Sequence, residues 1–382
     1  MKFLHLSDLH IGKGVNGFSM ITEQKHAFEQ IIEYIKTERP AAVAIAGDVY
    51  DRAVPGVEAV RLFDDFLTEL AKNDIAVLLI SGNHDSPERL DYAGRLLAEK
   101  RLHIYGLFDS ALRRVVLSDE YGEVNFWLMP FIKPSYFRGL TDKREIESYD
   151  EAVSAALQAA DIDYNSRNVL VSHQFYTKAG VSPVRSESEL NPVGGLDAVA
   201  AELIESFDYA ALGHLHGAQS AGPEYIRYCG SPIKYSFSEW RQKKSVTLVD
   251  LKEKGNLTIS ILPLTPIHDM REIKGELNRL TSDEIIELAN TEDYLRVILT
   301  DKEEIIDPMG KLRSVYPNVM SLGFENSRTS LDIGKITAGK DVTGTLSAYE
   351  LFGEFFLETQ GFVMSAEQAD IVRELLERQN EE

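Results

Sequence analysis

The sequence predicts an α/β fold in which short buried strands alternate with amphipathic helices. The strands are continuous apolar runs, whereas the helices repeat apolar residues every three to four positions. The first five elements are expected at residues 2–7, 22–36, 43–46, 57–72 and 76–80. This strand–helix–strand alternation is typical of a largely parallel sheet that is covered by helices.

Composition places the 382 residues among ordinary globular chains, and the length fits two or three domains or one core near the upper size limit. The formal net charge of −21 argues against a nucleic-acid partner when it is taken as a total. Its distribution weakens that argument, because residues 265–382 hold 24 of the 61 acidic but only 12 of the 40 basic residues. The first two thirds of the chain can therefore present a positive face.

We expect a cytoplasmic protein without membrane contact. No apolar run approaches the roughly 18 residues that cross a bilayer, and the first residues enter a strand pattern instead of a signal peptide. Cys229 is the only cysteine, so it forms no intrachain disulfide, which fits a reducing compartment. We expect it to be a small packing residue.

The remaining elements of the first region continue the alternation. A capping box of Ser148 and Glu151 predicts a helix start, and a hairpin turn is expected near residues 119–122. The expected elements are strands within 102–130, a helix at 148–160, a strand at 168–173, a helix at 196–205, and strands at 209–212, 224–228 and 245–251.

Residues 262–266, which contain two prolines, mark the first domain boundary. A compact strand–helix–strand–helix–strand pattern follows, with Asp307 capping a helix that starts at Pro308. Glycines then mark a linker, and capping boxes at Ser347 and Ser365 predict two final helices. The predicted domains are 1–264, 265–330, the linker 331–346 and the tail 347–382.

Polar side chains cluster at the ends of five predicted strands. They are Asp8 and His10, Asp48, Asn83 and His84, His173, and His214 and His216. Open α/β sheets place ligands at strand ends, and residues two apart there project to the same side. We expect two sets that share Asp48: Asp8, His10 and His216 in one, and Asn83, His173 and His214 in the other.

These residue types suit a pair of divalent cations. The two oxygens of Asp48 can bridge ions about 3.5–4 Å apart. Mixed imidazole, carboxylate and amide ligands suit Mn²⁺, Fe²⁺, Co²⁺ or Zn²⁺, so the metal stays open. Each piece alone also fits a capping aspartate or a structural histidine; the joint occurrence after apolar runs favours a metal site. His5, His26, His103 and His268 have no partner motif and are expected to be ordinary packing or surface residues.

These motifs resemble the calcineurin-like metallophosphoesterase superfamily over the first 250 or so residues. The resemblance is carried by Asp8-Leu-His10, Gly47-Asp48, Gly82-Asn-His-Asp85, His173 and Gly213-His-Leu-His216. It implies a sandwich of two mixed sheets flanked by helices, followed by a small α+β capping domain and a helical tail. It also implies two metal ions, held by Asp8, His10, Asp48, Asn83, His173, His214 and His216.

Four longer segments of the sequence resemble the bacterial DNA nuclease subunits of this superfamily. They are Leu6–His10, Ala46–Asp51, Ser81–Ser86 and Arg227–Pro232. This resemblance implies Mn²⁺-dependent cleavage of DNA, as a 3′→5′ exonuclease on duplex ends and an endonuclease at hairpins or single strands, in repair and recombination. It implies an ABC-type ATPase bound by the C-terminal helices, a homodimer within a heterotetramer, and a nucleoid-associated location. Relatives often have histidine at Asp51, so no role is carried over to that position.

His84 lies next to a metal ligand and is the expected group to stabilise or protonate the leaving oxygen. Candidate phosphate contacts are Lys13, Arg241, Lys243 and Lys244, although solvated surface charge explains them equally well. The aromatic stripe of the tail (Tyr349, Phe352, Phe355 and Phe356) needs a covering surface, either its own capping domain or a partner protein.

Two other functions compete with the DNA nuclease. One is a phosphoesterase that acts on nucleotides or phosphoproteins without a DNA role. The other is a non-catalytic scaffold for the ATPase, although all the expected ligands are present.

Overall fold

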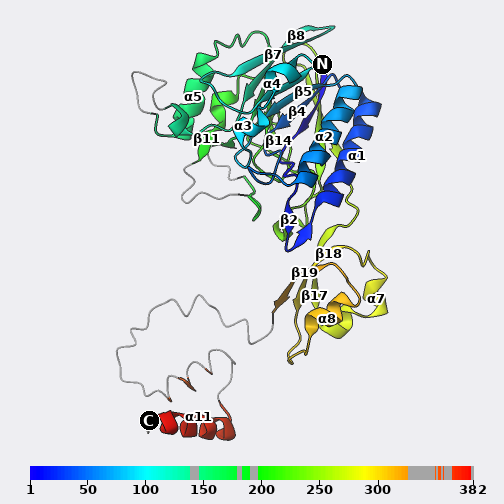
Figure 1. Cartoon of the computed structure of the whole chain (residues 1–382), viewed down its shortest axis with the longest axis vertical. Coiled ribbons are helices and arrows are strands. Elements are labelled where there is room, and N and C mark those ends of the chain that lie inside the picture. The colour runs from blue at the N-terminus through cyan, green and yellow to red at the C-terminus, as the bar shows by residue number, and fades with distance from the viewer. Residues whose placement is uncertain are drawn as a thin grey trace. The chain divides into compact units, whose positions relative to one another are not determined.

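The computed structural model describes residues 1–137, 146–178, 183–189 and 197–325, together with 349, 352–353, 356 and 364–379. Two compact units, Met1–Asp269 and Met270–Glu382, make up the chain (Figure 1). The predicted linker and most of the first predicted tail helix lie outside the described residues. No helix among the described residues has the length and apolarity that crossing a membrane requires.

Two mixed six-stranded sheets form the first unit. The first sheet has the order β16-β15-β1-β4-β5-β6, and the second has the order β13-β14-β12-β9-β8-β7. In the first sheet the strands are β1 (Lys2–Leu6), β4 (Ala42–Ala46), β5 (Ala76–Ile80), β6 (Leu102–Tyr105), β15 (Ser245–Leu251) and β16 (Leu257–Pro263). In the second they are β7 (Arg113–Asp119), β8 (Gly122–Met129), β9 (Arg167–Ser172), β12 (Tyr209–Leu212), β13 (Gln219–Ser220) and β14 (Ile226–Tyr228).

Parallel pairing in both sheets places the candidate ligands at one edge. Strands β1, β4, β5 and β6 run parallel, as do β8, β9, β12 and β14. The predicted sandwich of two mixed sheets is therefore confirmed. Its strands read as unbroken apolar runs because both faces of each central strand are covered, as in Ala42–Ala46, where every residue is buried.

The two sheets face one another through a core of aromatic and small apolar side chains. Phe3 of β1 packs edge-on against Phe126 of β8, with ring centroids 5.3 Å apart, and against Tyr209 of β12 at 5.8 Å. Cys229 is buried and its thiol donates to the carbonyl of His5 at 2.9 Å. This face-to-face packing fixes the two sets of strand ends relative to each other.

Helices α1 (Ile21–Glu38) and α2 (Val57–Lys72) lie side by side next to the first sheet (Figure 1). They meet through the stacked rings of Phe28 and Phe66, 4.5 Å apart. Helix α5 (Tyr149–Ala159) begins at the predicted capping box, in which Ser148 accepts from the Glu151 amide. The smaller elements are β2 (Gly14–Val15), β3 (Phe18–Ser19), α3 (Pro87–Leu90), α4 (Gly94–Ala98), η1 (Pro134–Phe137), β10 (Phe175–Thr177), β11 (Ala198–Ala200), η3 (Ala201–Ile204) and η4 (Phe237–Glu239).

The predicted helix at 196–205 is wrong. Residues Ala198–Ala200 form β11, which pairs in parallel with β10, and only the short 3₁₀ helix η3 follows. The apolar spacing of Val199, Leu203 and Ile204 fits a helix, but the backbone pairing with Phe175–Thr177 overrides that local preference.

The second unit contains a three-stranded parallel sheet of order β17-β18-β19. Its elements are β17 (Met270–Gly275), α6 (Leu277–Leu280), α7 (Asp283–Ile286), β18 (Tyr294–Leu299), α8 (Pro308–Arg313) and β19 (Val319–Phe324), followed in the tail by α11 (Ala366–Gln379). Asp307 caps α8 as predicted, accepting from the Gly310 amide at 3.1 Å. A separate core, which includes Leu295, Val297 and Leu312, packs the helices onto the sheet.

Glycines allow strand ends to approach each other closely, both between the two sheets (Gly213) and within the first sheet (Gly82). A Cβ on Gly213, after β12, would lie 1.9 Å from the Ala46 carbonyl oxygen at the end of β4. A Cβ on Gly82, after β5, would lie 2.1 Å from the Asp48 Oδ1. No larger residue fits at these two points while the backbones keep their positions.

We predict that Gly213→Ala destabilises the first unit by at least about 2 kcal/mol, because its added carbon meets backbone that has no room to move. Urea unfolding followed by tryptophan fluorescence measures this, since Trp127 and Trp240 both lie in the first unit. The control is Gly14→Ala, whose Cβ would make ordinary contact at 3.5 Å with the Phe18 carbonyl oxygen. Equal stability of the two variants would contradict the close approach.

Candidate metal centre

All eight candidate residues follow strands that end at the shared edge of the two sheets. Asp8 and His10 follow β1, Asp48 follows β4, and Asn83 and His84 follow β5, all in the first sheet. His173 follows β9, and His214 and His216 follow β12, in the second sheet. The loops after β1 and β4 extend the parallel pairing of these two strands. Asp8 N donates to Gly47 O at 3.1 Å, and His10 N donates to Asp48 O at 2.9 Å.

Four of these residues have unusual backbone conformations. The φ angles of Asp8, His10, Asp48 and His214 are +52°, +41°, +50° and +107°. Residues other than glycine rarely adopt a positive φ angle. Such strained backbone is most common at functional sites, where the surrounding structure enforces it. Here it turns the chain sharply at the strand ends.

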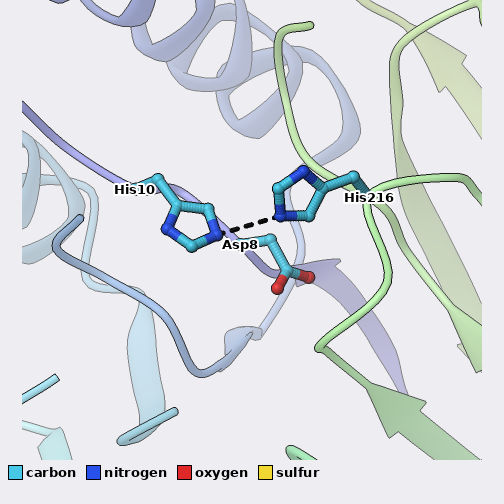
Figure 2. A group of neighbouring side chains, drawn as sticks. All are labelled: Asp8, His10 and His216. Atoms are coloured by element: carbon cyan, nitrogen blue, oxygen red, sulfur yellow. Dashed lines mark hydrogen bonds between the residues drawn. The ribbon is translucent and has the colours of Figure 1, made fainter. Parts of the chain in front are cut away.

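The first group brings together Asp8, His10 and His216 (Figure 2). Their ligand atoms lie within 4.8 Å of one another, and all three side chains are buried. The Nε2 atoms of His10 and His216 face each other at 3.0 Å. The Asp8 carboxylate accepts a hydrogen bond from the amide of His214 at 3.0 Å, which fixes its position next to the two imidazoles.

The second group is centred on the amide oxygen of Asn83. This Oδ1 lies 3.0 Å from His173 Nε2 and 3.2 Å from His214 Nδ1. His173 Nδ1 donates to the Ala46 carbonyl at 2.7 Å, so its Nε2 is the nitrogen turned toward the group.

Asp48 lies between the two groups. Its Oδ2 is 3.4 Å from His173 Nε2 in the second group and 3.6 Å from His10 Nε2 in the first. The structure therefore brings all seven predicted ligands together in the two predicted sets.

His84 lies beside this centre. Its ligand atom belongs to a cluster with His10 and Asp48, and its ring meets the His10 ring edge-on at 4.8 Å. The His84 amide donates to Asp48 Oδ1 at 2.9 Å, and its Nδ1 donates to the Asp51 carbonyl at 3.1 Å. The ring is only half-buried, so its Nε2 remains the nitrogen available for proton exchange.

Opposing charges set the protonation of the metal-free cluster. Burial opposes ionisation of both members of the Asp48–His173 pair, but their mutual attraction prevails. The pKa of His173 is thereby raised to about 9, and the pKa of Asp48 is held well below its usual value. Burial lowers the pKa of His214 to about 3 and that of His10 well below 6.5, with a contribution from the charges of neighbouring histidines. Burial also raises the pKa of Asp8.

The donor set fits divalent cations. Two carboxylates, an amide oxygen and four imidazoles converge with little exposure, and the His10 Nδ1 and His214 Nε2 atoms have no hydrogen-bond partner among the described residues. In the metal-free cluster a proton on His173 supplies the positive charge that the buried carboxylates need. Oxygen and nitrogen donors of this kind suit first-row transition metals.

Sequence reasoning missed Asp85, which holds two of the ligand loops together. Its carboxylate accepts the amides of Val49, Tyr50 and Gly82 at 2.9–3.1 Å, so it ties the loop after β4 to the loop after β5. Burial, and then the nearby charge of Asp48, raises the pKa of Asp85 to about 6. The feature of the sequence that could have identified Asp85 is its position directly after the Asn83-His84 pair.

The candidate phosphate contacts have different environments. Lys13 pairs with Asp51 at 2.7 Å, and Arg241 stacks on Trp240 at 4.5 Å. Lys243 is exposed. The prediction of Lys244 as a contact is wrong, because its side chain is 7% exposed and its ammonium pairs with Glu239 at 2.6 Å.

Comparison with known proteins assigns the chain to a family. Residues 1–218 match the calcineurin-like phosphoesterase model, and residues 266–360 match the model described as the type 5 capsule protein repressor C-terminal domain. The first match covers more than half of the chain, so the chain belongs to the calcineurin-like phosphoesterase family.

The narrower resemblance to SbcD nuclease subunits is also confirmed. The chain is 32% identical to the SbcD subunit of the nuclease SbcCD from Staphylococcus epidermidis over 325 residues, which are 84% of this chain and 85% of that protein. It is likewise 32% identical to the SbcD subunit from Staphylococcus saprophyticus over 326 residues, 84% of each chain.

Among solved structures, a Thermus thermophilus protein matches with a TM-score of 0.42 and 15% identity, covering 68% of this chain and 98% of that one. A dimetal phosphatase from Danio rerio matches with a TM-score of 0.40 and 12% identity, covering 70% and 97%.

We predict that metal binding releases a proton and strengthens as the pH rises. His173 is protonated at pH 7 because its pKa is about 9, and the incoming cation must displace that proton. Mn²⁺ affinity should rise about tenfold per unit between pH 7 and about 8.5. Calorimetric titration in two buffers of different ionisation enthalpy gives both quantities. A pH-independent affinity with no proton release would exclude the Asp48–His173 ion pair.

Proposed function

We propose that this chain is the nuclease subunit of a DNA-processing complex and hydrolyses phosphodiester bonds with two divalent ions, Mn²⁺ being the expected metal. The observation that carries the proposal is the position of Asp48, whose Oδ2 lies within 3.6 Å of a nitrogen from each ligand group. A carboxylate shared in this way supports a two-ion site rather than two separate sites.

When bound, two divalent ions would supply a nucleophilic water at neutral pH and positive charge for the phosphate oxygens. The chain's own residues position that chemistry. The Asp8 carboxylate is held by the His214 amide, and the Asp48 carboxylate is held by the His84 amide, so neither ligand has to reorganise when substrate binds.

His84 is the proposed proton donor to the leaving oxygen. The Asp51 carbonyl occupies its Nδ1–H, which fixes the ring and leaves Nε2 for proton exchange at the margin of the cluster. General acid catalysis of this kind contributes about 10²–10⁴-fold to a rate. The side chain of Asp51 is engaged with Lys13, so its part in this arrangement is to fix the loop.

DNA is the proposed substrate, with 3′→5′ exonuclease activity on duplex ends and endonuclease activity at hairpins or single strands, in repair and recombination. The names of the two staphylococcal relatives, which are nuclease subunits, support this choice. Exposed Lys243 and Arg241 follow β14 in the same unit and are candidate phosphate contacts. Residues 265–330 are the proposed DNA-capping domain.

The proposed partner is an SbcC-like ABC-type ATPase, because the relatives are named as subunits of SbcCD. Tail residues 347–382 are its proposed binding segment. Within the described part of the tail, Phe352 is 41% and Leu375 60% exposed, so both have apolar surface to bury. We place the complex in the cytoplasm, associated with the nucleoid.

A homodimer within the heterotetramer is the proposed assembly. Exposed apolar side chains follow two neighbouring strands: Val54, Val57 and Val60 after β4, and Tyr92 and Leu96 after β5. They offer apolar surface that a second copy can cover. Light scattering of the isolated chain would give twice the monomer mass, and a monomer at micromolar concentration would contradict the proposal.

We predict that the wild-type chain cleaves end-labelled duplex and hairpin DNA with Mn²⁺, and that His84→Ala lowers the rate about 10²–10⁴-fold while Mn²⁺ binding is retained. The assay is run with and without the ATPase. The matched control is His26→Ala on helix α1, which should keep the wild-type rate. Hydrolysis of nucleotides or phosphopeptides without DNA cleavage would favour the phosphoesterase alternative. Unchanged DNA cleavage by His84→Ala would disprove the role of His84.

A further inference from the structure

The Nδ1 nitrogen of His216 belongs to a buried hydrogen-bond network of polar side chains. Its Nε2 faces His10 in the first ligand group (Figure 2), whereas its Nδ1 lies 2.8 Å from Ser188 Oγ. Ser188 Oγ lies 2.6 Å from Glu239 Oε1, which is itself 3.4 Å from the His216 Nδ1. Glu239 and Ser188 are therefore candidates for controlling which nitrogen of His216 carries the proton.

Glu239 is an ionised carboxylate in a fully buried place. Its relative exposure is 0%, and its Oε2 accepts from the Lys244 ammonium at 2.6 Å. The Lys244 ammonium is the counter-charge that keeps this buried carboxylate ionised. An ionised carboxylate accepts hydrogen bonds and donates none.

The negative charge of Glu239 decides which atom donates in each hydrogen bond between Glu239, Ser188 and His216. Ser188 has one hydroxyl hydrogen, and the short contact to an acceptor-only oxygen directs it to Glu239. Ser188 Oγ can then only accept from the imidazole, so His216 carries its hydrogen on Nδ1. The lone pair of His216 is left on Nε2, the nitrogen that faces the ligand group.

We propose that Glu239 is the positioning residue of His216, acting through the Ser188 hydroxyl to hold the tautomer that presents the Nε2 lone pair to a divalent cation. The inference rests on the proposed two-ion function and adds to it a residue that does not touch the ions. Carboxylates that orient a metal-binding histidine in this way raise metal affinity about 10–100-fold.

Lys244 couples the same carboxylate to the backbone of His216. Its ammonium also donates to His216 O at 2.9 Å and to Ser231 Oγ at 2.9 Å. On the other side, His216 N donates to Glu189 Oε1 at 2.7 Å. The ring and the main chain of His216 are thus both fixed, which restricts its Nε2 to one direction.

The arrangement acts on the first ligand group alone. His173 in the second group gives its Nδ1–H to the Ala46 carbonyl, which needs no side chain. His10 has no hydrogen-bond partner for its Nδ1 among the described residues. Loss of Glu239 should therefore weaken one ion and spare the other.

The test compares Glu239→Gln with the wild type in the full chain. The Gln amide can donate to Ser188, whose hydroxyl then donates to His216 Nδ1 and moves the imidazole hydrogen to Nε2. ¹⁵N-histidine NMR of the metal-free protein should show this change of tautomer. Calorimetric titration with Mn²⁺ should show one site about 10–100-fold weaker and the other unchanged.

Two further variants make the test decisive. Glu239→Gln with Lys244→Met removes both buried charges, so the measurement survives if the single variant fails to fold. Glu224→Gln, at an exposed carboxylate that pairs with Arg227, is the matched control and should bind both ions as the wild type does. An unchanged His216 tautomer, or two Mn²⁺ ions bound by the Glu239 variants at wild-type affinity, would overturn the proposal. A wild-type chain that binds no Mn²⁺ contradicts the proposed function instead, and the tautomer still decides whether Glu239 positions His216.

Discussion

The placement of the Asp48 carboxylate is the constraint on which the rest of the site depends. It lies at the end of the central strand β4, with imidazoles from both sheets within 3.6 Å. Gly213 leaves no room for a side chain between its own backbone and Ala46, so the two sheets can approach closely, and Gly82 leaves none beside the Asp48 carboxylate within the first sheet. The sandwich core, through Phe3 and its partners in the second sheet, sets that separation. The fold thus acts chiefly as a frame that brings five loops to one carboxylate.

This placement has an electrostatic cost that the surrounding groups offset. A buried carboxylate without a counter-charge is strongly destabilising. In the metal-free cluster, a proton on His173 supplies that counter-charge. The same need for positive charge suits the cluster to a divalent cation. Outside the ligands, Asp85 accepts three amides and Glu239 pairs with Lys244, so charged groups one layer further out hold the ligand loops in position.

Much of this could be predicted from the sequence, because the ligands follow apolar runs that are easily recognised. Val43–Ala46 must be a strand, and strand ends in such sheets gather at one edge, so Asp48 and its neighbours could be grouped before the structure was known. The roles of Glu239 and Lys244 could not be predicted, because they depend on pairing between residues brought together only by packing. Lys244 resembles any surface lysine in sequence, and the strand at Ala198–Ala200 forms only because Phe175–Thr177 lies beside it.

The central claim is that two cations bind on either side of the Asp48 carboxylate. Anomalous diffraction from crystals of the full chain soaked in Mn²⁺ tests it most directly. The account predicts two peaks about 3.5–4 Å apart, one near His10 and His216 and the other near Asn83 and His173. A single peak, or none at this edge of the sheets, would contradict it.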